Sequence, residues 1–397
     1  MIEISKALKL IDRETSAIGI EKLGLTAAVG RILAENIVAD SDLPPFDRSQ
    51  MDGYAVVASD TINAPVKLKI VGESAAGRGW HKTMRSGEAV RIMTGAPVPD
   101  GADAVQKVEV TKESDGAVEI LEPVEKGRSI VRKGSEIGSG SIVFRSGEVI
   151  TENMIAALAA FGYAKVRVGK SPRVAILGTG SEIVEITKKP GRDQIRNSNS
   201  IMLEVFCRRF GVRTEIRSIV KDDISNLKSE IKSAVKGCDI LILTGGVSVG
   251  KYDHTKTALS ELGAKIFFEK IRLKPGKPAV FARLGTTLVF GLPGNPVSAA
   301  VTFHLLVRKA ILKMQAATST DLRTGHAILA ADAKAAKDRD TYLPSRLETN
   351  ELGQLIAHPL KWHGSSDFIG FARADSLVYV PSGTHIKKDE VASIAIL

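Results

Sequence analysis

The spacing of apolar residues predicts helices at both ends of the first 170 residues, with short strands between them. Ala7, Leu8 and Ile11 form one apolar helical stripe, and residues 25–33 predict a second helix. Between residues 60 and 145, closely spaced glycines separate short β-branched runs. Glycine at this density interrupts helices and favours strands joined by tight turns. We therefore expect a small all-β module there, followed by a helix over 151–160.

From about residue 171 the pattern alternates between strand and helix. Residues 174–177 and 240–243 are short apolar runs typical of strands inside a parallel sheet. A helix is expected over 200–210, with Ile201, Val205 and Phe206 facing inward. Strands that alternate with helices indicate βαβ units and an α/β domain. The remaining elements expected here are a strand over 215–220, a helix through 227–235, a helix over 254–262, strands near 266, 280 and 288, and a helix over 297–314.

Beyond about residue 320 the chain returns to short strands, which predict a separate small β domain. The expected strands cover residues 327–329, 354–358, 377–380 and 391–396. The fold class is therefore α/β multidomain, with a doubly wound α/β domain and two small β domains besides the N-terminal helical region.

Composition narrows the class of protein. The 397 residues are 44% hydrophobic and 25% charged, as in ordinary globular proteins, and the net charge is +10. That charge favours an anionic partner, but the charges are interspersed, which argues against a basic tail for nucleic acid. Cys207 and Cys238 are the only cysteines, which excludes a disulfide framework, and we expect both to be reduced core residues. No apolar run is long enough to span a membrane and no signal peptide is seen, so we expect a soluble, cytoplasmic protein.

Candidate chemistry gathers in loops that follow predicted strands. Gly245, Gly246 and Ser248 lie in such a loop and suit a phosphate, although a purely structural turn fits equally well. Asp253, a few residues later, either holds a divalent cation against phosphates or caps the next helix. The basic stretch 270–278 is either an anion-binding loop or a solvated turn.

Three further stretches contain candidate site residues. Residues 292–298 (LPGNPVS) open a helix with ordinary helix-start residues. Residues 44–56 (PPFDRSQMDGYAV) combine two carboxylates, an arginine and a serine as a site does, and residues 91–99 resemble a second loop of that site. The sequence contains no HExxH and no GxSxG, which disfavours a histidine zinc site and α/β-hydrolase chemistry.

Taken together, these stretches resemble the molybdopterin molybdenumtransferase (MoeA-like) family, which includes the E domain of gephyrin. PPFDRSQMDGYAV, MTGAPVPDGADAV, TGGVSVG followed by Asp253, KPGKP and LPGNPVS occur in the family's order and approximate spacing. The resemblance covers about the whole chain. It implies the last step of molybdenum cofactor synthesis: molybdenum from molybdate enters adenylylated molybdopterin, with Mg²⁺-dependent hydrolysis and release of AMP.

The resemblance also implies a homodimer with a shared active site and no nucleic-acid or membrane partner. Its domains would be an elongated helical and mixed N-terminal domain (1–45 and 141–170), an inserted β module (46–140), an α/β molybdopterin-binding domain (171–317) and a C-terminal β barrel (318–397). Two alternatives remain: a molybdopterin adenylyltransferase, which lacks the N-terminal half and the C-terminal domain, and a non-catalytic gephyrin-like scaffold, against which the intact acids and lysines argue.

The family's functional positions carry over residue by residue. The resemblance implies these catalytic residues: Asp52, Thr94, Glu182, Asp222 (with Asp223 in an alternative register), Lys270 and Lys274. It implies these substrate-binding residues: Gly245, Gly246, Ser248, Pro293, Gly294, Asn295, Pro296, Arg346 and Ser365. Asp253 and Glu136 would be metal ligands. Three positions depart from the family: Glu136 replaces an Asp, Lys251 an acid and His363 a Gln.

Overall fold

The computed structural model describes residues 1–221, 223–246, 254–360 and 364–397, and divides the chain into two compact units. Unit 1 consists of Met1–Glu35, Ser146–Ile155 and Ala164–Leu397, and unit 2 of Asn36–Arg145 and Ala156–Tyr163. Each unit therefore contains segments that are distant in sequence. The units are described separately below.

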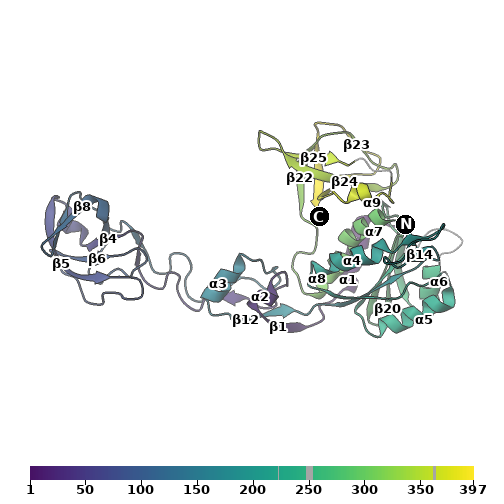
Figure 1. Cartoon of the computed structure of the whole chain (residues 1–397), viewed down its shortest axis with the longest axis horizontal. Coiled ribbons are helices and arrows are strands. Elements are labelled where there is room, and N and C mark those ends of the chain that lie inside the picture. The colour runs from purple at the N-terminus through teal and green to yellow at the C-terminus, as the bar shows by residue number, and fades with distance from the viewer. Residues whose placement is uncertain (222, 247–253, 361–363) are drawn as a thin grey trace. The chain divides into compact units, whose positions relative to one another are not determined.

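Unit 2 contains the expected β module. Its six-stranded sheet has the order β7-β4-β6-β5-β9-β8 (Figure 1). Tyr54, Leu68, Val118 and Ile120 are buried at its centre, which accounts for the β-branched and aromatic runs between the glycines. The sheet strands are β4 (Gly53–Val56), β5 (Val66–Ser74), β6 (Glu88–Ile92), β7 (Ala104–Lys107), β8 (Thr111–Ser114) and β9 (Ala117–Ile120).

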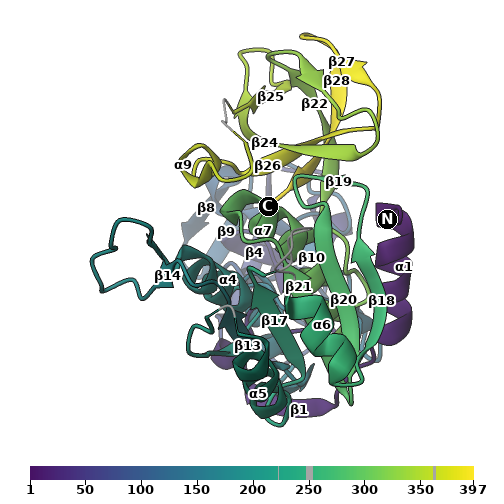
Figure 2. The same ribbon diagram turned by 90° about the vertical axis from the view of Figure 1, so that its right-hand side faces the viewer.

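Unit 1 is built on a six-stranded mixed sheet of order β16-β13-β17-β21-β20-β18. The first four strands are parallel, whereas β21-β20-β18 are antiparallel (Figure 2). The apolar runs at 174–177 and 240–243 lie in the parallel part, as expected. The strands are β13 (Arg173–Gly178), β16 (Arg213–Ile216), β17 (Ile240–Thr244), β18 (Lys265–Lys270), β20 (Pro278–Leu284) and β21 (Thr287–Leu292).

Helices cover both faces of this sheet. Val174 and Ile176 pack into one core with α1, α4, α7 and α8, whereas Ala175 and Leu177 pack into another with α5 and α6. This two-residue alternation is what a strand buried on both sides requires. The helices are α1 (Ile4–Glu14), α4 (Ser198–Arg208), α5 (Ile224–Val235), α6 (His254–Glu261), α7 (Pro296–Thr302) and α8 (Arg308–Met314). A π-helical turn, Phe303–Val307, joins α7 to α8.

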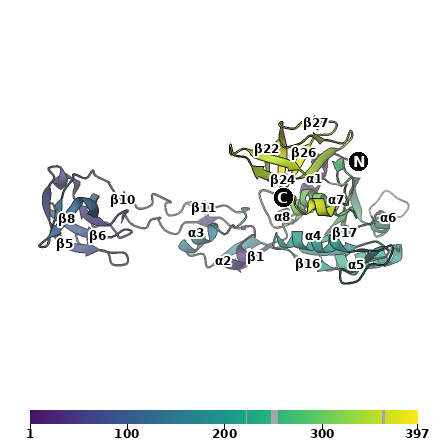
Figure 3. The ribbon, with the colours of Figure 1, turned by 45° about the horizontal axis from the view of Figure 1, so that its top comes forward.

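The C-terminal strands close into a small barrel, which confirms the expected β domain. Pairing runs β24-β25-β22-β28-β26 and returns from β26 to β24 (Figure 3). A further strand, β19 (Leu273–Lys274), leaves the α/β part and pairs in parallel with β24. The barrel strands are β22 (Thr324–Leu329), β24 (Asp340–Thr349), β25 (Leu355–Pro359), β26 (Ser376–Val380) and β28 (Val391–Ile396).

Shorter elements complete the described chain. They are α2 (Leu25–Ala28), α3 (Met154–Ala160), α9 (Phe368–Phe371), β1 (Ile20–Gly24), β2 (Ile37–Val38), β3 (Arg48–Ser49), β10 (Ile130–Val131), β11 (Ile142–Phe144), β12 (Lys165–Gly169), β14 (Ile183–Val184), β15 (Ile195–Arg196), β23 (Ala333–Lys334) and β27 (His385–Ile386). None of the described helices has the length and apolar character needed to cross a membrane.

Two local predictions were wrong. Residues 25–33 form only the four-residue helix α2, since Leu33 instead bridges to Val168 of β12. In α4, Ile201 and Val205 are exposed and the core takes Leu203 and Cys207. The first error arises because residues beyond Ala28 pair with other extended segments instead of continuing a helix. The second arises because tertiary packing buried a different face of α4 from the one that the apolar spacing indicated. Burial of Cys207 and Cys238 is as expected.

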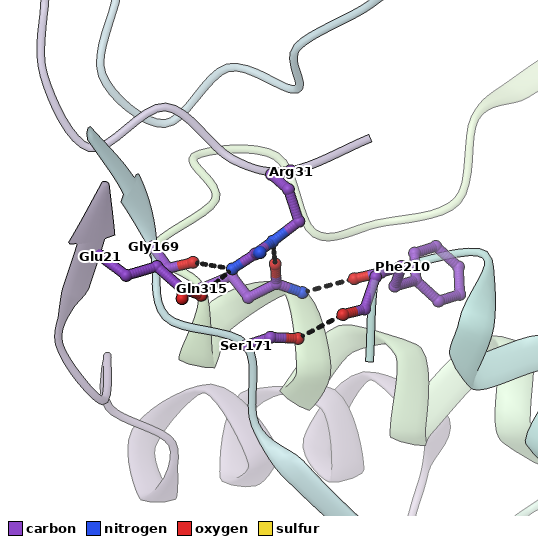
Figure 4. Close-up of polar contacts among 7 residues, drawn as sticks. Glu21, Arg31, Gly169, Ser171, Phe210 and Gln315 are labelled. Carbon is purple, nitrogen blue, oxygen red and sulfur yellow. Dashed lines mark hydrogen bonds and ion pairs between the residues drawn. The ribbon is translucent and has the colours of Figure 1, made fainter. Parts of the chain in front are cut away.

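A buried arginine joins β1, β12 and the end of α8. The Arg31 guanidinium donates to Glu21 Oε1 at 2.6 Å, to the Gly169 carbonyl at 2.7 Å and to Gln315 Oε1 at 3.3 Å (Figure 4). Gln315 Nε2 in turn donates to the Phe210 carbonyl at 3.0 Å. A buried charge is tolerated only when it is paired in this way, so we interpret Arg31 as a structural residue.

Candidate active site

One cavity, here called the central cavity, lies at the carboxyl ends of three parallel strands. Its volume is about 650 Å³. Thr179 follows β13, Gly245 follows β17 and Gly294 lies just beyond β21, and all three line it. Ligands of open α/β sheets bind at this edge. The cavity therefore lies where the doubly wound prediction places a ligand.

The turn at Gly245 requires glycine. Its φ is +90°, and a Cβ there would lie 2.2 Å from the Thr179 carbonyl oxygen. Any side chain would displace the neighbouring strand end, so the residue type is fixed by a close backbone approach. The structural interpretation of this glycine is thus correct, and it is compatible with the cavity that the turn lines.

Polar side chains with unused bonding capacity lie beside the central cavity. Asn199 Nδ2 donates to Thr244 Oγ1 at 2.9 Å and to the Gly294 carbonyl at 2.8 Å, which fixes the orientation of the amide. Asn199 Oδ1 and Thr179 Oγ1 are buried and have no hydrogen-bond partner among the described residues. Since buried polar atoms are almost always paired, this wall is suited to a polar ligand.

A second cavity, the cationic cavity, has a volume of about 540 Å³. Lys274, Lys277 and Arg339 line it, and no carboxylate is among its described lining residues. Gly276, between the two lysines, has φ +121°, and a Cβ there would lie 2.7 Å from Thr302 Cγ2. The loop therefore packs closely against α7 while its cations face the cavity. Such a set of positive side chains suits a small anion.

Asn295 lines both cavities, so they are neighbours. Asn295 Nδ2 donates to Ser365 Oγ at 2.7 Å, and the Val297 amide donates to the Ser365 carbonyl at 3.1 Å. These bonds hold the C-terminal segment against the start of α7. The LPGNPVS stretch, ordinary helix-start chemistry when taken alone, thus forms part of the boundary between two cavities.

Sequence reasoning missed Arg339. This residue lies just before β24, far along the chain from Lys274, and an acid, Asp338, pairs with it at 3.2 Å. The parallel pairing of Leu273–Lys274 with Asp340–Thr341 brings the arginine to the lysine loop. Because β24 itself was not predicted, no signal in the sequence pointed to this contact.

The structure brings some of the predicted site residues together and leaves others apart. The central cavity is lined by Glu182, Gly245, Gly294, Asn295 and Pro296, and the cationic cavity by Lys274, Pro293, Asn295 and Ser365. Gly246 adjoins Gly245, and a Cβ atom added at Gly246 would lie 2.7 Å from Thr179 Oγ1. Lys270, at the end of β18, and Arg346, exposed on β24, are not among the described lining residues of either cavity. Asp222, Ser248 and Asp253 lie outside the described residues.

The predicted residues of unit 2 make their own contacts. Asp52 Oδ1 accepts bonds from the Thr94 amide at 2.7 Å and the Thr94 hydroxyl at 3.0 Å. These bonds, the backbone one foremost, lower the pKa of Asp52 below its usual range. Asp52 is therefore an ionised carboxylate whose direction is set by Thr94. Glu136 forms an ion pair with Arg48 at 3.1 Å.

The described residues do not build a metal site by themselves. No group of three or more histidine, cysteine, aspartate or glutamate side chains in that part of the chain is close enough to hold an ion. Glu136 has Arg48 as its neighbour, and Asp253 lies outside the described part.

Comparison with known proteins identifies the family. Residues 2–162 match the MoeA N-terminal region (domain I and II), residues 175–313 a probable molybdopterin binding domain, and residues 326–397 the MoeA C-terminal region (domain IV). The molybdopterin molybdenumtransferase of Staphylococcus aureus (strain COL) is 33% identical over 96% of this chain and 92% of its own length, and that of Staphylococcus epidermidis (strain RP62A) is 32% identical over the same shares. The crystal structure of a molybdopterin biosynthesis MoeA protein from Pyrococcus horikoshii OT3 covers 100% of both chains at 30% identity, with a TM-score of 0.86. The chain therefore belongs to the molybdopterin molybdenumtransferase family, and its cavity at the strand ends and its lysine loop are consistent with that membership.

Proposed function

We propose that this enzyme transfers molybdenum from molybdate to adenylylated molybdopterin, with release of AMP. The observation that carries the proposal is the pair of neighbouring cavities that share Asn295. One is cationic, and the other has a polar wall in which Asn199 Oδ1 and Thr179 Oγ1 have no partner in the described part of the chain. The reaction needs a small oxyanion beside a large ring-bearing substrate, and these cavities offer one place for each.

The cationic cavity would bind molybdate. Lys274, Lys277 and Arg339 supply positive charge, and the arginine adds directed N–H donors for an oxyanion. Ser365, fixed through Asn295, adds a neutral polar group that does not repel the anion. Positive charge held in place before the anion arrives also stabilises negative charge that develops on a leaving phosphate.

The central cavity would bind the organic substrate. Asn199 Oδ1 and Thr179 Oγ1 offer acceptors to ring N–H or hydroxyl groups. The tight turn at Gly245 brings backbone close to the cavity, where an anhydride linkage fits better than beside a bulky side chain. Glu182 lines the same cavity. Asp222 and Lys270 remain predicted catalytic residues from the family resemblance.

Asp52 would act on the reaction from a second subunit. It is ionised and oriented by Thr94, as a group that positions water or a substrate hydroxyl must be. We propose a homodimer whose site combines Asp52 of one subunit with Lys274 of the other. At a molybdate concentration where the Asp52→Asn and Lys274→Ala proteins are each inactive alone, mixing them in equal amounts should restore about a quarter of the wild-type activity. Mixed subunits that stay inactive, although exchange is verified, would contradict the shared site.

Dependence on Mg²⁺ is also part of the proposal, with Asp253 and Glu136 as its predicted ligands. When bound, the ion would supply positive charge to the phosphates. The Asp253→Asn variant should bind Mg²⁺ more weakly, measured by calorimetry, and keep its fold. Unchanged Mg²⁺ affinity would return Asp253 to the role of a helix cap.

The direct test is AMP release from adenylylated molybdopterin by the purified protein, with and without molybdate or tungstate. We expect release that depends on the oxyanion. Synthesis of adenylylated molybdopterin from ATP would instead favour the adenylyltransferase alternative. Binding of substrate without any AMP release would favour the scaffold alternative.

A further inference from the structure

A third cavity of about 380 Å³ adjoins the central cavity and has a different character. Ser198, Pro296 and Phe368 line both, so the two cavities are neighbours. The remaining wall is largely apolar and aromatic, with Met202 and Phe206 from α4 and Phe371 from α9. Helix α9 contacts α7 here (Figure 2). We call this the His304 cavity after its buried polar residue.

His304 lies in the wall of this cavity and also lines a further cavity of about 360 Å³. The π-helical turn Phe303–Val307 presents it, and π-helical turns are rare and often found at functional sites. Its ring lies between aromatic neighbours, with centroids 4.6 Å from Phe206 and 5.8 Å from Phe303. The side chain is only 5% exposed, and its ring nitrogens have no hydrogen bond to any residue in the described part of the chain.

The charge state of His304 indicates what it can bind. Burial, with the nearby cations Arg209 and Arg308, lowers the pKa of the imidazole to about 4. At neutral pH the ring is uncharged and offers one N–H donor and one acceptor nitrogen. One of these nitrogens can form a single hydrogen bond to the edge of a planar nitrogen heterocycle, which carries both donors and acceptors. Arg209, at the rim of the cavity, attracts a phosphate attached to such a ring.

We propose that the His304 cavity receives one of the two heteroaromatic rings of the substrate, with the ring stacked among Phe206 and Phe371 and its edge hydrogen-bonded to His304. This inference rests on the proposed function, because adenylylated molybdopterin has two such rings, a pterin and an adenine, joined by a pyrophosphate. The central cavity takes one ring and the His304 cavity the other. The volume of about 380 Å³ falls within the range of small-molecule sites.

The test compares two probes, AMP and 6-hydroxymethylpterin, by calorimetry on full-length protein. His304→Phe keeps the aromatic packing and removes the ring nitrogens, and Ala374→Trp fills the cavity. His358→Phe, on a partly exposed histidine of β25, is the matched control. We expect one probe to bind about tenfold more weakly to both cavity variants and the other probe to bind as it does to wild type. The probe whose affinity falls identifies which ring, adenine or pterin, occupies the His304 cavity.

Each other outcome is decisive. Wild-type affinity of both probes for a folded Ala374→Trp protein would overturn the proposal. Wild-type affinity of both probes for His304→Phe would contradict the proposed hydrogen bond to His304. If Ala374→Trp does not fold, Ala372→Trp at the exposed part of the same wall replaces it. Failure of wild-type protein to release AMP would instead contradict the proposed function, so the two failures are distinguishable.

Discussion

Replacing Arg339 with glutamine should weaken oxyanion binding, whereas replacing its neighbour Asp338 should strengthen it. The Arg339 side chain is 27% exposed and pairs with Asp338 at 3.2 Å, so part of its charge is already neutralised. A hydrogen bond to a charged group contributes about 1.5–3 kcal/mol. Because of the ion pair and solvent screening we expect the lower half of that range, which corresponds to about a 10- to 40-fold loss of molybdate affinity.

The second variant, Asp338→Asn, removes the competing carboxylate and keeps its size. Arg339 stabilises the ionised form of Asp338 and lowers its pKa, so the carboxylate is charged at neutral pH. Its removal should raise molybdate affinity about two- to fivefold, on the scale of exposed ion pairs. Neither change should alter thermal stability much. Calorimetric titration with molybdate measures both affinities, and changes of the same sign in the two variants would refute the placement of Arg339 at the oxyanion.

Three further predictions concern the free energy of unfolding and ligand binding in the central cavity. Arg31→Leu removes the donor to the Gly169 carbonyl, so urea denaturation should show a loss of about 1–3 kcal/mol. The pKa of His304 is lowered to about 4 in the folded protein, so the unfolded chain binds the proton more readily. The free energy of unfolding is therefore unaffected by this histidine above about pH 6.5 and decreases as the pH falls toward 4. Relative to His304→Phe, wild type should lose about 3 kcal/mol between pH 7 and 4, and parallel stability curves would contradict this. Gly245→Ala places a methyl group against the Thr179 carbonyl, so the affinity for either AMP or 6-hydroxymethylpterin, whichever occupies the central cavity, should fall at least tenfold. Unchanged affinity for both probes would argue against a ligand in the central cavity.

Much of the fold was predictable because it depends on local patterns. The apolar runs at 174–177 and 240–243 are strands buried on both faces, and the glycine-rich region is a β module. Where two apolar faces were possible, as in α4, the choice depended on the packing of α7 and α8 against it, which no local pattern contains. Strand β24 was missed because its burial does not alternate regularly.

The candidate site was predictable as a set of loops but not as cavities. The glycine turn and the lysine loop follow strands, and each lines a cavity, while their roles in binding remain predictions. Arg339 reaches Lys274 only through the pairing of β19 with β24, which joins segments more than sixty residues apart. His304 lies inside a helix and carries no motif, so only its burial and its aromatic neighbours reveal it.

The most direct measurement of the central claim is a single-turnover reaction with adenylylated molybdopterin and molybdate, in which AMP and cofactor-bound molybdenum are both quantified. The account predicts one molybdenum incorporated for each AMP released, with the Lys274→Ala protein needing more molybdate to reach the same yield. AMP release at the same rate without molybdate, or AMP release with no metal in the product, would contradict it.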